Sequence, residues 1–215
     1  MRRASRWAVA LTAVAASVAL AAGCGASDGN VASVPAAPGA QLADRLLSAE
    51  ELGIPGFTAT REPVEPQDAV ESSAGDPCAA RRMHDVRMLQ EAGLQARVRR
   101  SFESGDGGAL SIVQQFATPA GATAAQKAFV AGLDRDWPGC DEGVTTTAFD
   151  TTTLDHPPGA TLAHTVQTGR DVPGEAWNVF FTDGRFLYTV GAIGTGVTRD
   201  AVVAAAGRAY DKRAG

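Results

Sequence analysis

Cysteine, histidine and aromatic residues are scarce in this 215-residue chain. It holds three cysteines and three histidines, and 6% of its residues are aromatic. Three cysteines are too few for a disulfide scaffold or a structural zinc cluster. Basic residues are also outnumbered, with 19 Lys and Arg against 24 Asp and Glu and a net charge of −5. That deficit argues against a nucleic-acid binder, which needs cations to neutralise phosphates.

Signatures of several common enzyme and cofactor sites are also absent. The chain has no His-Glu-x-x-His, no P-loop, no dinucleotide fingerprint and no protein-kinase motifs. Its histidines, His84, His156 and His164, lie on different expected elements without a shared ligand spacing, which argues against a metal site. We therefore expect a protein that is not an enzyme and carries no cofactor.

The first residues have the pattern of a lipoprotein signal peptide. Three arginines precede an uncharged run, Trp7–Ala22, made mostly of Ala, Val and Leu. Its 16 residues are short for a membrane span of about 20 and suit the apolar core of a signal peptide. Residues 20–24 read Leu-Ala-Ala-Gly-Cys, which resembles the lipobox of bacterial lipoproteins. We predict cleavage after Gly23 and lipidation of Cys24; the alternative is an ordinary secretory signal whose Cys24 is incidental.

A lipid anchor on Cys24 would place the protein on the extracytoplasmic face of the cell membrane. Acyl chains in pairs hold a protein there durably, whereas a single chain binds marginally. Residues 24–41 contain no aromatic residue and no periodicity, which is typical of a flexible tether. We expect one folded domain over residues 42–215, within the usual size range of a domain.

Lipidation of Cys24 leaves Cys78 and Cys140 as an even pair in an oxidising compartment. A bridge between them closes a loop of about 63 residues and stabilises by roughly 4 kcal/mol in the chain-entropy model. The alternatives are two free thiols or a reactive site. We predict the Cys78–Cys140 disulfide.

The folded part is predicted to alternate helices with antiparallel strands. A capping box at Ser48–Glu51 opens a short helix that ends at Gly53, and residues 58–76 are a polar surface loop. Longer helices begin at Asp76-Pro77, Thr118-Pro119 and Thr198. Strands are expected over residues 95–103, 109–116, 144–149 and 160–167.

The last hairpin carries the strongest strand signal. Asp183-Gly184 is typical of a type I′ turn. A two-residue loop there pairs Phe181 with Phe186, Val179 with Tyr188 and Trp177 with Val190, all on one face. The fold class is therefore predicted as α+β, a mostly antiparallel sheet of about six strands with helices packed on one face.

The order of these parts also suggests a family. Leu-Leu-Ser-Ala-Glu-Glu-Leu at 46–52, Pro-Cys at 77–78, Trp-Pro-Gly-Cys at 137–140, the Trp177 hairpin and a final helix follow one another. This arrangement resembles the extracellular sensor domain of PknH-like actinobacterial kinases, which also occurs alone in lipoproteins. The resemblance covers about residues 46–213 and rests on spacing. It implies a ligand-binding or sensing module with a cleft beside the sheet, in which Cys78 and Cys140 form the first cysteine pair. The second pair that many members have in the last hairpin is absent here.

Two side chains stand out as candidates for ligand binding. Arg100 interrupts the apolar face of the strand 95–103, where it is either an anion-binding group in the cleft wall or a snorkelling or edge residue. His164 shares an apolar strand face with Leu162 and Val166, as a ligand-binding residue or a hydrogen-bonded core histidine. The arginine-rich run 81–100 is either a solvated face or a docking patch for an acidic partner.

These observations favour a membrane-anchored, non-catalytic module that binds a small ligand or an envelope protein. We expect a monomer that contacts the membrane through the acyl chains on Cys24. The alternative is a lipid or glycolipid carrier, which requires an apolar cavity of at least several hundred Å³. A deep apolar cavity would favour the carrier, and a shallow polar cleft would favour the sensor-like module.

Overall fold

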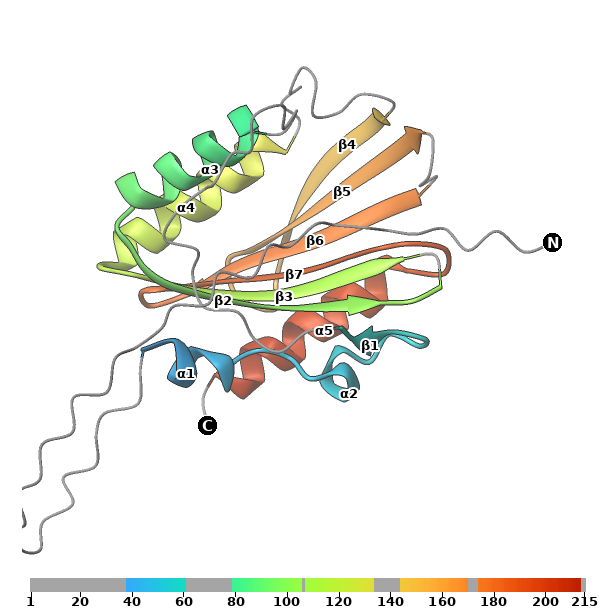
Figure 1. Ribbon diagram of the computed structural model, residues 1–215. Coiled ribbons are helices and arrows are strands. Elements are labelled where there is room, and N and C mark those ends of the chain that lie inside the picture. The colour runs from blue at the N-terminus through green and yellow to red at the C-terminus, as the bar shows by residue number, and fades with distance from the viewer. Residues whose placement is uncertain (1–37, 61–78, 106, 134–143, 170–173, 214–215) are drawn as a thin grey trace, which may run out of the picture. The chain divides into compact units, whose positions relative to one another are not determined.

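The computed structural model describes residues 38–60, 79–105, 107–133, 144–169 and 174–213, all within the compact unit Ala36–Gly215 (Figure 1). The lipidation site Cys24 and the predicted cysteine pair, Cys78 and Cys140, lie outside these ranges. Lipidation and the disulfide therefore stay predictions. Among the described residues, no helix is both long and apolar enough to cross a bilayer.

Within these ranges the chain forms an α+β domain around one antiparallel sheet of seven strands. The strand order is β1-β2-β3-β7-β6-β5-β4. The strands are β1 Thr58–Ala59, β2 Leu94–Glu103, β3 Gly108–Phe116, β4 Val144–Leu154, β5 Ala160–Gly169, β6 Gly174–Asp183 and β7 Phe186–Ile193. The helices are α1 Pro38–Ala43, α2 Ala49–Leu52, α3 Ala79–Glu91, α4 Pro119–Gly132 and α5 Arg199–Lys212.

Helices cover both faces of the sheet, so the prediction of helices on one face is wrong. Helices α3 and α4 lie on one side, and α1, α2 and α5 lie on the other (Figure 1). The reason is visible in β6, where the three consecutive residues 179–181 are apolar. Phe181 is buried in the cluster that contains α5, and Phe180 is buried in the cluster that contains α4. Since neighbouring strand residues point to opposite faces, both faces need a cover.

The helix starts follow the predicted caps. Ser48 Oγ accepts from the Glu51 backbone N–H at 3.1 Å, and Glu51 Oε2 accepts from the Ser48 N–H at 2.7 Å. Thr118 and Thr198 cap α4 and α5 in the same way, accepting the backbone N–H three residues on. These local hydrogen bonds explain why the helix positions were predictable from the sequence.

Two segments differ from the sequence prediction. Thr58–Ala59 pairs with β2 as a short edge strand, although it was predicted as loop. Helix α1 begins at Pro38, inside the segment predicted as tether. Its end is ordered because Leu42 is 2% exposed and belongs to the core.

The last hairpin has a different register from the predicted one. Phe181 pairs with Tyr188, and Val179 pairs with Val190. The turn residues are Gly184 and Arg185, with a positive φ at Gly184 and none at Arg185. A type I′ turn requires positive φ at both positions, whereas a type II′ turn has glycine first. The observed register differs from the predicted one by two residues along one strand, so each residue still lies on its predicted face of the sheet.

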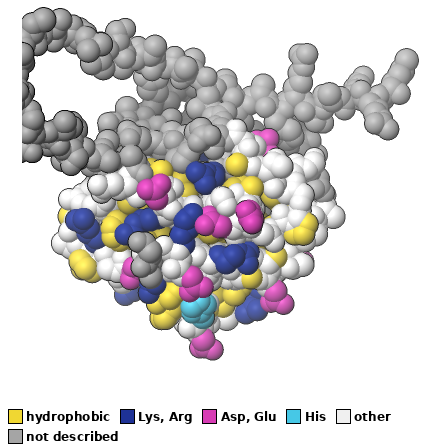
Figure 2. All heavy atoms as spheres, turned by 90° about the horizontal axis from the view of Figure 1, so that it is seen from below, with side chains coloured by type: hydrophobic (Ala, Val, Ile, Leu, Met, Phe, Trp, Pro, Cys, Tyr) yellow, Lys and Arg dark blue, Asp and Glu magenta, His cyan; other side chains and the backbone are white. Residues whose placement is uncertain are grey.

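Cationic side chains hold the segment 42–54 against the sheet and α5. Arg100 Nη1 donates to the Leu47 carbonyl at 2.9 Å, and Arg208 Nη2 donates to the Leu52 carbonyl at 2.7 Å. Lys212 Nζ donates to the carbonyl of Leu46 at 3.0 Å. Figure 2 views the molecule from this side, and basic and acidic side chains are interspersed there among apolar ones. The cations of this side thus have acceptors within the fold.

Candidate functional site

A groove of about 320 Å³ lies against strands β2, β3, β6 and β7. Helices α3 and α4 leave this part of the sheet open. The cluster beneath them includes Phe116 and Leu187, at one end of β3 and β7. The groove lining includes Gly108 and Ile193, at the opposite ends of the same two strands. The volume is at the lower end of the range for small-ligand sites.

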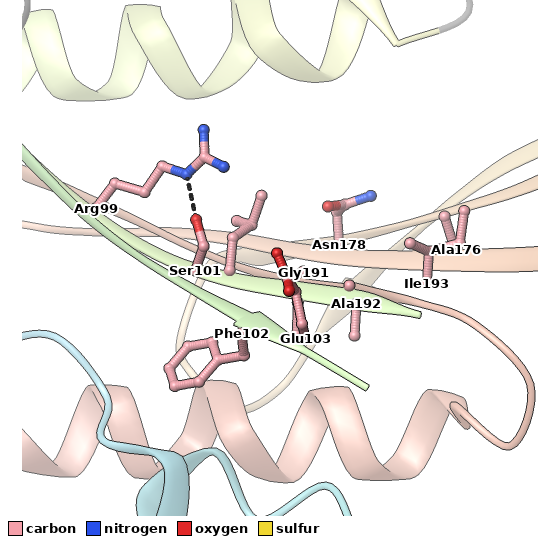
Figure 3. A pocket seen from close by; sticks show the side chains of 12 residues that line it. Arg99, Ser101, Phe102, Glu103, Ala176, Asn178, Gly191, Ala192 and Ile193 are labelled. Carbon is pink, nitrogen blue, oxygen red and sulfur yellow. Dashed lines mark hydrogen bonds between the residues drawn. The ribbon is translucent and has the colours of Figure 1, made fainter. Parts of the chain in front are cut away.

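The polar side chains of the groove point to the same side of the sheet as α4. Figure 3 shows Arg99, Ser101 and Asn178 on that side, whereas Phe102 points toward α5. Arg99 Nε donates to Ser101 Oγ at 2.9 Å. Gly191 pairs with Asn178 across the strands, and a Cβ on Gly191 would overlap the Asn178 amide oxygen. Glycine at this position therefore makes room for a polar side chain on the sheet surface.

A row of polar side chains, Arg97, Arg99 and Gln114, extends from the groove along one face of β2 and β3 toward α3. Arg97 lies two residues from Arg99 on the same strand face and pairs with Gln114 of β3. Gln114 is 1% exposed, and its Nε2 has no hydrogen-bond partner among the described residues. A buried amide without an acceptor is unusual in a folded protein.

The Arg97 side chain is half-buried beside α3. Burial lowers its pKa from the ordinary value, and the positive charge of Arg99 lowers it further. The carboxylate of Asp85 in α3 raises the pKa of Arg97, but by less than the charge of Arg99 lowers it. Arg97 therefore carries its charge beside a like charge that the neighbouring carboxylate does not fully offset.

Arg100 lies on the opposite face of the sheet from the groove. It is half-buried, faces the α5 side and donates to the Leu47 carbonyl. Its neighbours along the strand face, Val98 and Phe102, are in the core. The predicted anion-binding role of Arg100 stays a prediction, and its position favours holding the segment 42–54.

His164 also faces the α5 side, away from the groove. Its ring stacks on Trp177 with centroids 3.8 Å apart and planes 9° apart. Its Nδ1 lies 3.3 Å from Asp150 Oδ2, and its Nε2 lies 3.7 Å from Glu175 Oε2. The side chain is 15% exposed. The structure therefore brings neither of the two predicted binding residues into the groove. Within the described ranges, no three His, Cys, Asp or Glu side chains gather where they could hold a metal ion.

Sequence reasoning missed Arg97, Arg99 and Gln114. The alternation along β2 places Arg97 and Arg99 opposite Arg100, on a face that was assigned to solvent. That assignment followed from expecting helices on one face only. The run of apolar residues at 179–181 was the signal for a second covered face, because a strand with one solvated face alternates.

No protein-family model matches the chain, and a search of curated proteins finds no match. Among solved structures, the extracellular domain of PknH from Mycobacterium tuberculosis is similar, with a TM-score of 0.55 at 15% identity. The match covers 83% of this chain and 98% of that domain. An uncharacterized protein of Mycobacterium smegmatis, an Rv0999 ortholog, gives a TM-score of 0.44 at 12% identity, and the match covers 81% of this chain and 97% of that one. The chain thus has the fold of a PknH-like sensor domain, which confirms the resemblance at the level of fold.

Proposed function

We propose that this protein is a membrane-anchored, extracytoplasmic lipoprotein that binds a small ligand without transforming it, as a sensor-like module. The groove on the α3 and α4 side of the sheet is the site, and it is the observation that carries the proposal. Its lining combines small residues with the polar side chains of Arg99, Ser101 and Asn178. A concave surface with a few polar groups is the usual form of a ligand site.

The lining supports binding rather than catalysis. The described residues that line the groove include no histidine, cysteine or lysine. Ser101 therefore lacks a histidine or lysine partner there, the usual activators of a serine nucleophile, and Glu103 is the acidic residue of the lining. The fold adds support, since a similar solved structure is the extracellular domain of PknH.

The carrier alternative fits the groove less well. A diacyl lipid needs a long apolar cavity, and about 320 Å³ with an arginine and an asparagine in its wall offers little of one. The described residues thus favour a small polar ligand.

Ligand binding can be tested by filling the groove. Ala176 lines it, so Ala176→Phe should exclude the ligand. We expect native mass spectrometry of the complete chain, isolated from its host envelope in mild detergent, to show a small non-covalent adduct. The adduct should be absent from Ala176→Phe and present in the control Ala124→Phe, at an exposed position of α4. An adduct that persists in Ala176→Phe would place the ligand elsewhere, and an acyl-lipid adduct would favour the carrier.

The anchor can be tested by metabolic labelling with an alkyne fatty acid. We expect label on the wild-type chain, none on Cys24→Ser, and full label on the control Cys78→Ser. Equal label on wild type and Cys24→Ser would contradict lipidation at Cys24.

A further inference from the structure

We propose that the ligand carries a carboxylate or phosphate group, and that Arg97 and Gln114 hold this group beside Arg99. This inference rests on the proposed function of the groove and adds the chemical class of its ligand.

The first argument is the shared position of the donors. Arg97 and Gln114 face each other across β2 and β3, and Arg99 follows Arg97 by about 7 Å along the same strand face. Arg99 lines the groove and Arg97 and Gln114 do not, so an acidic group that they hold would extend from the groove toward α3. Guanidinium and amide groups together offer the planar N–H donors that oxyanions accept.

The second argument is the missing acceptor. Gln114 is buried, and its Nε2 has no partner among the described residues. A buried donor without an acceptor weakens a fold, so its presence needs a compensating role. An oxyanion beside Arg97 supplies the acceptor that this amide lacks.

The third argument is the local charge. Among the described residues, Asp85 of α3 acts on the Arg97 charge, and Glu103 lines the far end of the groove. Asp85 offsets the repulsion between Arg97 and Arg99 only in part, and it already lies 3.6 Å from His84 Nδ1. A bound anion would favour the charged form of Arg97, which burial and the charge of Arg99 disfavour.

The test uses the complete chain in an uncharged detergent, labelled with ¹⁵N and followed by NMR. Inorganic phosphate and sn-glycerol 3-phosphate are titrated at constant ionic strength, with glycerol as the uncharged control. We expect saturable shifts of the Gln114 side-chain amide and the Arg97 Nε–H with both phosphates and none with glycerol. Tighter binding of glycerol 3-phosphate would indicate a lipid headgroup as the source, and equal binding a free anion.

Variants decide whether these residues hold the anion. Arg97→Gln should weaken phosphate binding by about tenfold or more, and Gln114→Leu by a smaller factor. The control Arg199→Gln removes the same charge from an exposed position on α5 and should change binding by less than about twofold. Equal binding by wild type and Arg97→Gln would overturn the proposal, as would no saturable shift.

The two proposals fail in different ways. A neutral molecule excluded by Ala176→Phe, and bound equally by Arg97→Gln, would overturn the anion class and leave the proposed function intact. Phosphate bound at Arg97 in a protein that yields no groove adduct from its host would overturn the proposed function instead.

Discussion

At the scale of single residues, two buried glutamines have opposite surroundings. Gln126 is 8% exposed and donates from Nε2 to the carbonyls of Gly159 and Phe180 at 3.2 and 3.1 Å. Gln114 is 1% exposed, and no described residue accepts from its Nε2. The glutamine amide nitrogen thus has hydrogen-bond acceptors at position 126 and none among the described residues at position 114.

We therefore expect opposite effects from one substitution. Gln114→Leu should raise the free energy of unfolding by about 1 kcal/mol, because it removes an unsatisfied buried donor. Gln126→Leu should lower it by about 1–3 kcal/mol, because the buried contact to the Phe180 carbonyl and the part-buried contact to the Gly159 carbonyl both lose their donor. Urea unfolding without added ligand measures both. Loss of stability in Gln114→Leu would mean that this amide has an acceptor in the free protein.

The sequence predicted on which face of β2 each residue lies better than it predicted the role of that residue. The alternation of β2 correctly placed Arg100 beside Val98 and Phe102. The sequence could not tell that the partner of Arg100 is the Leu47 carbonyl, because that contact joins positions 53 residues apart. The roles of Arg97 and of the groove residue Arg99 were missed for the same reason, since the cover of their strand face is a tertiary property.

At the scale of elements, the capping box of α2 is linked to the last turn of α5. Lys212 Nζ donates to Glu51 Oε2 at 2.7 Å, and the Ser48 backbone N–H donates to the same carboxylate. Burial alone would raise the pKa of Glu51, but these hydrogen bonds and the charge of Lys212 bring it below its ordinary value of 4.5.

Because the pKa of Glu51 is lowered in the folded state, the free energy of unfolding should depend on pH. A carboxyl group whose pKa is lower in the folded than in the unfolded state stabilises the fold at pH values above its unfolded-state pKa. This stabilisation is lost as the pH falls through the folded-state pKa. We expect Glu51→Gln to lower the free energy of unfolding at pH 7. The difference from wild type should shrink as the pH falls below about 4.5 and should be lost once the carboxyl group is protonated in the folded state. A difference that is constant from pH 7 to pH 2 would show that the ion pair adds nothing.

The predicted Cys78–Cys140 bridge is also a link between elements, although both residues lie outside the described ranges. The bridge would join the segment before α3 to the segment after α4. We expect Cys78→Ser, Cys140→Ser and the double variant to lose the same stability, roughly 4 kcal/mol. Alkylation of the unfolded, unreduced wild type should modify neither residue. Small, additive losses in the variants would indicate free thiols.

Element positions were predictable where local chemistry determines them. Caps at Ser48, Thr118 and Thr198 give the helix starts, and the glycine-rich loop gives the β2–β3 hairpin. The register of the β6–β7 hairpin was wrong because Asp-Gly and Gly-Arg loops leave the same residues on the same face. Hydrophobic alternation has a period of two, so it cannot distinguish registers that differ by two residues.

At the scale of the whole molecule, the α+β class and the likeness to a PknH-like sensor domain follow from the order of elements. The seven strands of the described sheet form two apolar surfaces, one under α5 and one under α3 and α4. The cluster under α3 and α4 lies at one end of β3 and β7, and the groove lies at the opposite ends of these strands. The sequence could not reveal this, because an uncovered end depends on how far the helices reach across the strands.

The central claim is that a small ligand occupies this groove. A crystal structure of the complete chain, isolated from its own host's envelope in mild detergent, tests it most directly. We predict electron density for a small molecule against Arg99, Ser101 and Asn178, with an acidic group directed toward Arg97. An empty groove in a crystal grown from protein with its native adduct, or an acyl chain bound elsewhere in the domain, would contradict the account.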